Sequence, residues 1–189
     1  MKILLLPTYC KPEHAASGYL SQNRNEAFAK EKWHMVSYVP TPSRGISEQV
    51  RKEYCQKGMK IEYDMNGYRM IRRFSMFKEG KHPLSRALRY FLVSFRQFTL
   101  SIFDKQAHEC NLIFVASTPP IQGAMASLVK KIKKIPFVYN LQDIFPDSLA
   151  GTGLAKKGGL LWKIGRVIEN FTYRNADKII VISEDFKRN

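Results

Sequence analysis

The chain has 189 residues, enough for one well-filled core and marginal for two, and 44% of them are apolar. It holds no low-complexity or repeated segment, which excludes a linker, a coiled coil and a solenoid. The 31 Lys and Arg residues exceed the 16 Asp and Glu residues, and the net charge of +15 predicts an anionic partner: a membrane surface, nucleic acid or a phosphorylated substrate.

The cysteines predict a reducing compartment for the protein, and the amino terminus predicts that it is not exported. Cys10, Cys55 and Cys110 are odd in number, far apart and without nearby His partners, so we expect reduced thiols and neither disulfides nor a zinc site. The opening MKILLLPTY has an apolar run that Pro7 ends after a few residues, which is too short for a signal peptide or a membrane span. We therefore expect no transfer across a membrane.

The predicted elements alternate between strands and helices from the first residues onward. Short apolar runs are typical of buried parallel strands, and strands that alternate with helices at this spacing favour a mostly parallel sheet covered on both faces. We predict strands at 2–6, 36–39, 111–115, 136–141 and 178–182, and helices at about 19–32, 121–133 and 159–174. The fold class is therefore α/β, Rossmann-like and doubly wound.

Residues 59–74 predict a β-hairpin inserted into this pattern. Apolar and polar residues alternate on both sides of Asn66-Gly67. Both residues accept the positive φ angles of a tight type I′ turn, so the turn is expected there.

Residues 83–107 predict a basic amphipathic helix. Its apolar residues fall on one side at helical spacing, while Arg86, Arg89 and Arg96 gather on the opposite side. Taken alone, this helix favours a core element with a solvated charged face. The net charge of the chain favours contact with anionic lipid headgroups instead. The residues expected at such a surface are Arg86, Arg89, Arg96, Lys130, Lys131, Lys133 and Lys134.

The candidate chemistry lies in the loops that follow strands. In an open parallel sheet, ligands bind outside the carboxyl ends of the strands. The loops at 7–18, 116–120 and 142–153 should therefore open on one edge. Asp143, which follows the strand at 136–141 directly, is the first catalytic candidate, and Asp147 near the next turn is the more structural carboxylate.

Other loop residues are candidates for substrate binding. The hydroxyl groups of Ser117 and Thr118 are expected to cap the next helix or, together with its first amides, to face a ligand. His14 is a candidate hydrogen-bond donor, although a lone loop histidine is more often solvated. His34, His82 and His108 have no spacing that would build a metal site.

Several motifs are missing. The sequence has no Gly-x-Gly-x-x-Gly after its first strand, no Gly-x-x-x-x-Gly-Lys-Ser/Thr and no Gly-x-Ser-x-Gly, so dinucleotide, nucleoside triphosphate and nucleophile-elbow chemistry are not supported. We expect no cofactor and no bound metal. Nucleic acid is a poor partner, because no recognition motif accompanies the scattered basic residues.

The chain resembles the amino-terminal half of glycosyltransferase family 4, most of all the bacterial fucosaminyltransferase-like enzymes of capsule and O-antigen synthesis. The resemblance covers nearly all of the chain. It rests on KILLLPTYCKPE with Ser17-Gly18, the hairpin motif at 67–72, the Ser117-Thr118-Pro119-Pro120 loop, DIFPDS at 143–148 and YRNADKIIVIS at 173–183. Many relatives have Gly-Gly at the position of Ser17-Gly18, and Trp-Pro-Glu in place of Phe145-Pro146-Asp147.

The resemblance implies a GT-B architecture of two facing Rossmann-like domains, of which this chain is the acceptor-binding one. Residues 1–182 would form that domain and 183–189 the start of the linker, with the donor domain absent; no two glutamates here are eight positions apart, as they are in the family's second domain. The implied reaction moves a sugar with retention from a nucleotide-diphosphate sugar to a lipid-diphosphate-linked saccharide. Asp143 would orient or deprotonate the acceptor, and the implied substrate-binding residues are His14, Ser17, Gly18, Ser117, Thr118 and Gln142.

The resemblance and the charge together favour a cytoplasmic enzyme, peripheral at the inner face of the cytoplasmic membrane, with the isolated chain inactive. The alternative is a non-catalytic module that binds anionic membranes or partner proteins.

Overall fold

The computed structural model describes residues 1–15, 18–55, 60–147, 156–184 and 187. The chain divides into two compact units, residues 1–111 and 112–189. The predicted organisation, one domain over 1–182 followed by a linker, stays a prediction.

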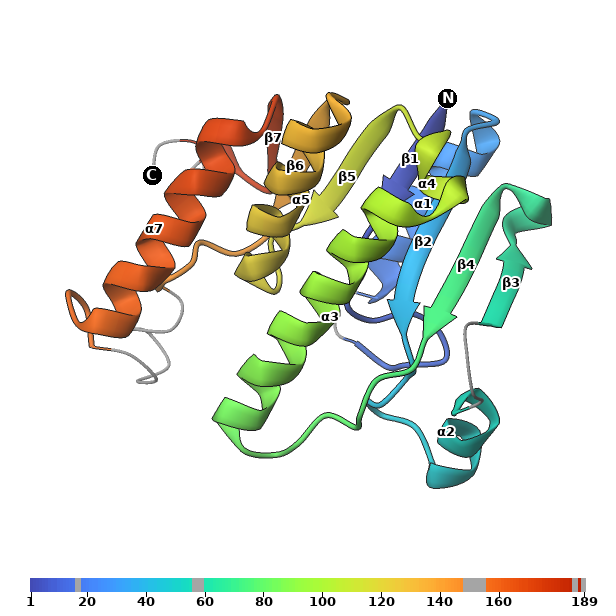
Figure 1. The fold of residues 1–189 in the computed structure, drawn as a ribbon, viewed down its shortest axis with the longest axis horizontal. Coiled ribbons are helices and arrows are strands. Elements are labelled where there is room, and N and C mark those ends of the chain that lie inside the picture. Colours follow the sequence, from blue (N-terminus) through green and yellow to red (C-terminus); the bar gives the residue numbers. More distant parts are fainter. Residues whose placement is uncertain (16–17, 56–59, 148–155, 185–186, 188–189) are drawn as a thin grey trace. The chain divides into compact units, whose positions relative to one another are not determined.

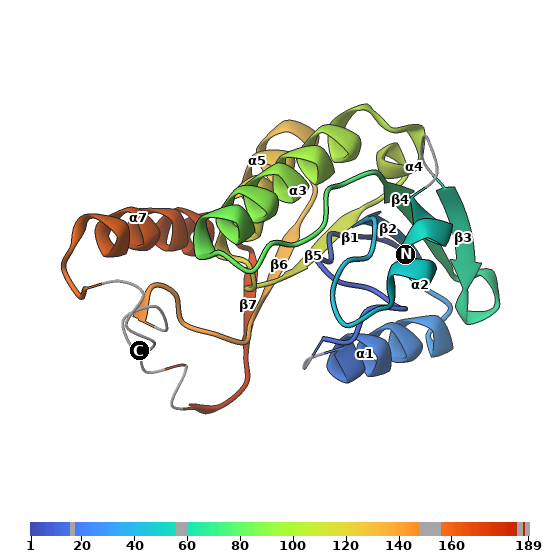
Figure 2. The same ribbon diagram turned by 90° about the horizontal axis from the view of Figure 1, so that it is seen from below.

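The first unit is a sheet with helices on both faces. Its strands run in the order β3-β4-β2-β1, in which β1, β2 and β4 are parallel and β3 is antiparallel to β4. Helix α1 covers one face and α3 the other (Figure 2). The elements are β1 (Lys2–Leu5), α1 (Gly18–Lys30), β2 (His34–Pro40), α2 (Glu48–Tyr54), β3 (Lys60–Asp64), β4 (Arg69–Phe74), α3 (Pro83–Phe103) and α4 (Lys105–His108).

The second unit repeats the alternation of strand and helix with three parallel strands in the order β5-β6-β7. Helices α5 and α7 lie side by side on one face of these strands (Figure 1). The helices approach closely because Gly123 of α5 has no side chain: a Cβ there would lie 2.5 Å from Thr172 Cγ2. The elements are β5 (Leu112–Ala116), α5 (Pro120–Lys133), β6 (Phe137–Leu141), α7 (Leu160–Asn175) and β7 (Lys178–Val181).

These elements confirm the predicted mostly parallel α/β class. The central strands are rich in apolar residues because both of their faces are covered; Ile3 and Leu4 of β1 and Met35 and Val36 of β2 are buried. The predicted hairpin is present as β3 and β4, paired from Lys60–Arg73 to Asp64–Arg69. Its turn is longer than expected, since a short 3-10 segment at Met65–Gly67 joins the strands, and Met65, Asn66 and Gly67 all have positive φ.

Helix α2 and a break after α3 were not predicted. The side chain of Ser47 caps α2 by accepting a hydrogen bond from the Val50 amide, and Glu48 in the first turn suits the helix dipole. The predicted helix at 83–107 ends at Phe103, and Asp104 caps the short α4 by accepting from the Gln106 amide. Each of these two short helices begins after a capping side chain, Ser47 or Asp104, and apolar periodicity does not reveal such caps.

Helix α3 packs its polar side on the sheet, which corrects the interpretation as a core helix with a solvated charged face. Arg89, Ser94, Gln97 and Ser101 are completely buried, beside Val93. The apolar stripe predicted from the helical spacing faces solvent instead. Its exposed members are Leu84, Leu88, Phe91 and Phe95.

Hydrogen bonds to backbone carbonyls explain this orientation. Gln97 Nε2 donates to Pro7 O at 2.9 Å and to Tyr38 O at 2.7 Å. Arg89 Nε donates to Phe77 O at 3.0 Å and Arg89 Nη2 to Thr41 O at 3.3 Å. These carbonyls lie at or just beyond the carboxyl ends of β1 and β2 and in the segment before α3, and buried carbonyls need a donor.

Replacing Arg89 with Ala should lower the free energy of unfolding by about 3 kcal/mol, because the carbonyls of Phe77 and Thr41 lose their charged donor and a cavity forms. Chemical denaturation measures the change. Arg96→Ala on the same helix is the matched control; its exposed side chain should change stability by no more than about 0.5 kcal/mol. Equal effects of the two substitutions would contradict the orientation of α3.

Candidate functional site

Ser117 joins the two strand-end loops of the second unit. Its side chain, just after β5, is only 2% exposed, and its Oγ accepts hydrogen bonds from the amides of Gln142 at 3.0 Å and Asp143 at 3.1 Å. The Ser117 amide in turn donates to Asn140 O of β6 at 3.0 Å. The loops that follow β5 and β6 therefore meet at one edge, as expected for neighbouring parallel strands.

The Asp143 side chain is exposed at this edge. Within the described ranges, its carboxylate makes no hydrogen bond and no ion pair. Its backbone is held by Ser117, so a fixed main chain presents an open carboxylate. Near it, Thr118 is exposed and Gln142 is half-buried.

Asp147 has the structural role expected of it. Its Oδ2 pairs with Arg166 Nη2 at 2.6 Å and its Oδ1 accepts from Trp162 Nε1 at 3.1 Å, both on α7. Partial burial acts to raise the pKa of Asp147, but the hydrogen bonds from Trp162 and Arg166 outweigh it and leave that pKa below its ordinary value. Gly165 lets this segment pack on α7, since a Cβ there would lie 2.5 Å from the Phe145 ring.

The loop hydroxyl groups do not cap α5, which was one of the two roles predicted for them; contact of Ser117 and Thr118 with a ligand stays a prediction. The N-cap of that helix is Pro119, with no side-chain capping hydrogen bond, and Ser117 Oγ is used by the loop after β6 instead. Ser17 lies outside the described residues.

Sequence reasoning missed Glu169, a fully buried carboxyl group on α7. Burial raises the pKa of Glu169 to about 7, opposed by the hydroxyl groups of Tyr173 and Tyr139 and the charge of Arg166, while the negative charge of Asp143 adds to the rise. The buried side of α7 consists of Gly165, Glu169 and Thr172, whereas its apolar residues Leu160, Ile164 and Val167 are exposed, so the apolar periodicity of the helix gave no signal for Glu169. The group is coupled electrostatically to the Asp143 loop and titrates near neutral pH.

The first unit contains a pocket of about 1050 Å³ between the loop after β1, helix α1 and the hairpin. His14 and Gly18, both predicted to contact substrate, line it, and His14 is exposed. Tyrosine rings and neutral polar side chains also line it, among them Tyr9, Tyr54 and Gln22. Such a surface offers ring stacking and hydrogen bonds to a polar ligand.

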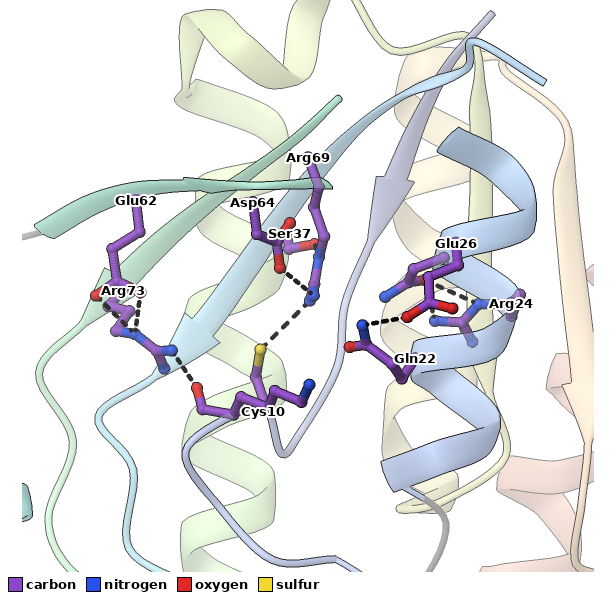
Figure 3. Close-up of polar contacts among 11 residues, drawn as sticks. Cys10, Gln22, Arg24, Glu26, Ser37, Glu62, Asp64, Arg69 and Arg73 are labelled. Carbon is purple, nitrogen blue, oxygen red and sulfur yellow. Dashed lines mark hydrogen bonds and ion pairs between the residues drawn. The ribbon is translucent and has the colours of Figure 1, made fainter. Parts of the chain in front are cut away.

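Two buried arginines of β4 form one wall of this pocket (Figure 3). Arg69 pairs with Asp64 at 3.3 Å and donates to Ser37 Oγ and Cys10 Sγ. Arg73 pairs with Glu62 at 3.2 Å and donates to the Lys11 carbonyl. The arginines thereby hold the loop after β1 against the hairpin.

Glu13 is a second residue that sequence reasoning missed, and its side chain connects the loop after β1 to the loop after β2. Its buried carboxylate accepts from the amides of Ser43 at 2.8 Å, Arg44 at 3.1 Å and Cys10 at 3.2 Å. Burial raises the pKa of Glu13, and those amides, followed by the charge of Arg89, oppose the rise. The neighbouring backbone at His14 is packed so closely on Gly45 that a Cβ at 45 would lie 2.9 Å from His14 Cβ.

The predicted membrane-surface cations differ in exposure. Arg89 is completely buried, so it is not available to any surface, which corrects its assignment. Arg96, Lys131 and Lys134 are exposed, whereas Arg86 pairs with Glu79 and Lys130 with Asp177. Lys133 is half-buried. Among the side chains that the structure describes, no group of three His, Cys, Asp or Glu could hold a metal ion.

Comparison with known proteins points to glycosyltransferases. No protein-family model matches the chain. Over 94 residues, which are 49% of this chain and 24% of the relative, it is 25% identical to a probable glycosyltransferase, WbjE of Pseudomonas aeruginosa.

Solved structures share the fold. HepE of Anabaena, in complex with UDP and glucose, superposes with a TM-score of 0.51 at 18% identity over 97% of this chain and 38% of its own. Sucrose-phosphate synthase of Thermosynechococcus elongatus gives a TM-score of 0.60 at 11% identity over 99% of this chain and 43% of its own. These neighbours are GT-B glycosyltransferases, and the chain spans less than half the length of WbjE, HepE and sucrose-phosphate synthase.

Ser117→Ala should loosen the loop that carries Asp143. Two amides lose their acceptor, so the free energy of unfolding should fall by about 1–3 kcal/mol. Hydrogen exchange at the Gln142 and Asp143 amides should accelerate more than exchange elsewhere in the unit. Thr118→Ala, at the exposed neighbouring position, is the control and should leave those amides protected.

Glu169 should make stability depend on pH. Its folded pKa of about 7 lies above the unfolded value of 4.5, so its contribution is complete below about pH 4.5 and is lost as pH rises through 7. Glu169→Gln should remove this fall, which for one group cannot exceed about 1.4 kcal/mol per pH unit. Urea denaturation of both proteins between pH 4.5 and 8 measures it, and parallel curves would contradict the assignment.

Proposed function

We propose that the chain is the acceptor-binding half of a retaining glycosyltransferase of family 4. It moves a sugar from a nucleotide-diphosphate sugar to a lipid-diphosphate-linked saccharide, in the synthesis of a surface polysaccharide such as capsule or O-antigen. The observation that carries the proposal is the open carboxylate of Asp143, fixed by Ser117 at the strand ends of an α/β fold that glycosyltransferases share.

The comparisons support a transferase reaction with a nucleotide-sugar donor. WbjE is described as a probable glycosyltransferase, and structures of HepE contain UDP, UDP-glucose, or UDP with glucose. The donor is bound by sequence outside this chain, in keeping with the 38% of HepE that the chain covers. Family 4 and the fucosaminyltransferase-like branch are part of the proposal and rest on the motifs.

The chemistry asks little of the acceptor half beyond positioning. Glycosyl transfer passes through an oxocarbenium-like state, and the leaving diphosphate can accept the proton of the incoming hydroxyl group. Asp143 accepts a hydrogen bond from that hydroxyl and aligns its lone pair with the anomeric carbon. No covalent intermediate on the protein is needed.

The pocket of the first unit suits a saccharide. Its tyrosine rings stack on sugar faces, and Gln22, His14 and the acids of the hairpin exchange hydrogen bonds with hydroxyl groups. Gly18 exposes backbone at its rim. A lipid-linked acceptor also places the enzyme at the inner face of the cytoplasmic membrane.

One observation favours the alternative, a non-catalytic module that binds anionic membranes or partner proteins. The exposed apolar stripe of α3 is a binding surface that requires no chemistry. The two functions separate on activity, since only the first predicts sugar transfer.

Asp143→Asn should lower kcat about 100-fold, the lower range of the contribution of a positioned acid or base. The assay follows transfer from nucleotide-diphosphate sugars to lipid-diphosphate saccharides, using the protein with all coding sequence that continues beyond Asn189. Asp147→Asn is the matched control: it breaks the pair with Arg166 and should cost stability with less than a tenfold change in kcat. Unchanged turnover in Asp143→Asn, with intact circular dichroism, would remove Asp143 from the mechanism.

A further inference from the structure

The outward side of α3 is an exposed apolar helix surface. Leu84 is 74% exposed, Leu88 55%, Phe91 46% and Phe95 47%. These residues recur every three or four positions, so they form one stripe along the helix, about 16 Å long at 1.5 Å per residue. Phe91 and Phe95 stack with ring centroids 6.3 Å apart, and half-buried Phe98 continues the row.

The stripe cannot turn inward, because the opposite side of the helix makes hydrogen bonds to backbone carbonyls near the ends of β1 and β2. Arg89 and Gln97 are completely buried and hold carbonyls of the first unit. Turning α3 around its axis would bury the phenylalanines and leave those carbonyls without donors. The exposure is therefore built into the fold of this unit.

Cations flank the stripe. Arg96 lies beside Phe95, and Lys81 precedes the helix; both are exposed. At the carboxyl end, Arg96 and Lys105 line an open hollow of about 530 Å³ together with Phe103, which is 80% exposed. Apolar side chains with cations at their edges match the boundary between lipid headgroups and acyl chains.

We propose that α3 is an interfacial anchor that lies in the plane of an anionic lipid bilayer, with Leu84, Leu88, Phe91 and Phe95 inserted below the headgroups. Arg96 and Lys105 bind lipid phosphates at its carboxyl end. The inference deepens the proposed function, which supplies the reason for a membrane, while the surface stands on its own observations. It also replaces the predicted membrane contact through Arg86, Arg89 and Arg96, since Arg89 is completely buried.

Charge favours this occupant over a second copy of the chain. Two copies that meet through α3 would bring together molecules of net charge +15 with cations around the contact, and they would repel each other. An anionic bilayer is attracted by the same charges. None of the helices in the described part of the chain has the length and apolar composition of a membrane span. The proposed anchor does not require such a span, because it lies in the plane of the bilayer surface.

The test is vesicle sedimentation of the 189-residue chain at several salt concentrations. Vesicles of phosphatidylglycerol with phosphatidylcholine are compared with pure phosphatidylcholine. Phe91→Gln with Phe95→Gln should weaken binding to the anionic vesicles at least tenfold. Ile61→Gln with Tyr63→Gln removes two comparably exposed apolar side chains from β3 and should change it less than twofold. Arg96→Gln with Lys105→Gln should weaken binding and reduce its salt dependence, and circular dichroism checks each fold.

Three results would overturn the inference. The first is equal vesicle binding by the wild-type chain and the Phe91/Phe95 variant, and the second is equal binding of the wild type to neutral and anionic vesicles. The third is a wild-type dimer in sedimentation velocity that the same variant converts to monomer, since a second copy would then cover the stripe. Vesicle binding that depends on α3, without sugar transfer by the longer protein, would reject the proposed function alone.

Discussion

The contact between α3 and the ends of β1 and β2 determines which side of this helix is buried in the first unit and which side faces solvent. Arg89 donates to the carbonyl of Thr41, and Gln97 donates to the carbonyls of Pro7 and Tyr38, and these hydrogen bonds orient the helix. The charge of Arg89 also acts on Glu13, whose carboxylate gathers amides from the loops after β1 and β2. Glu13 therefore fixes the loop that lines the pocket, while Arg89 and Gln97 fix which side of α3 faces outward.

Most of the fold could be predicted because its strands and helices obey simple periodicities. The apolar runs of β1 and β5 are almost completely buried, and Asn66-Gly67 marks the hairpin, so local pattern and tertiary structure agree. The orientation of α3 could not be predicted from its amphipathic pattern. Periodicity identifies two sides of a helix, but here hydrogen-bond demand from distant carbonyls decides which side is buried.

The candidate site was predicted in part for similar reasons. Asp143 could be located because a carboxylate directly after a buried strand lies at the sheet edge. The double hydrogen bond to Ser117 and the buried Glu169 required coordinates, since both depend on residues more than twenty positions apart in the sequence. Arg89 was misplaced because charge alone suggested a surface.

The segment from Gln142 to Asp147 is tethered at both ends. At one end, Ser117 accepts hydrogen bonds from the first two amides. At the other end, Phe145 packs on Gly165, and Arg166 and Trp162 donate hydrogen bonds to Asp147. A side chain carried by such a bridge has little backbone freedom left to lose when a partner arrives. Any ligand that meets Asp143 thus encounters a main chain already ordered, and the entropic penalty of alignment falls mainly on one rotamer and on the ligand.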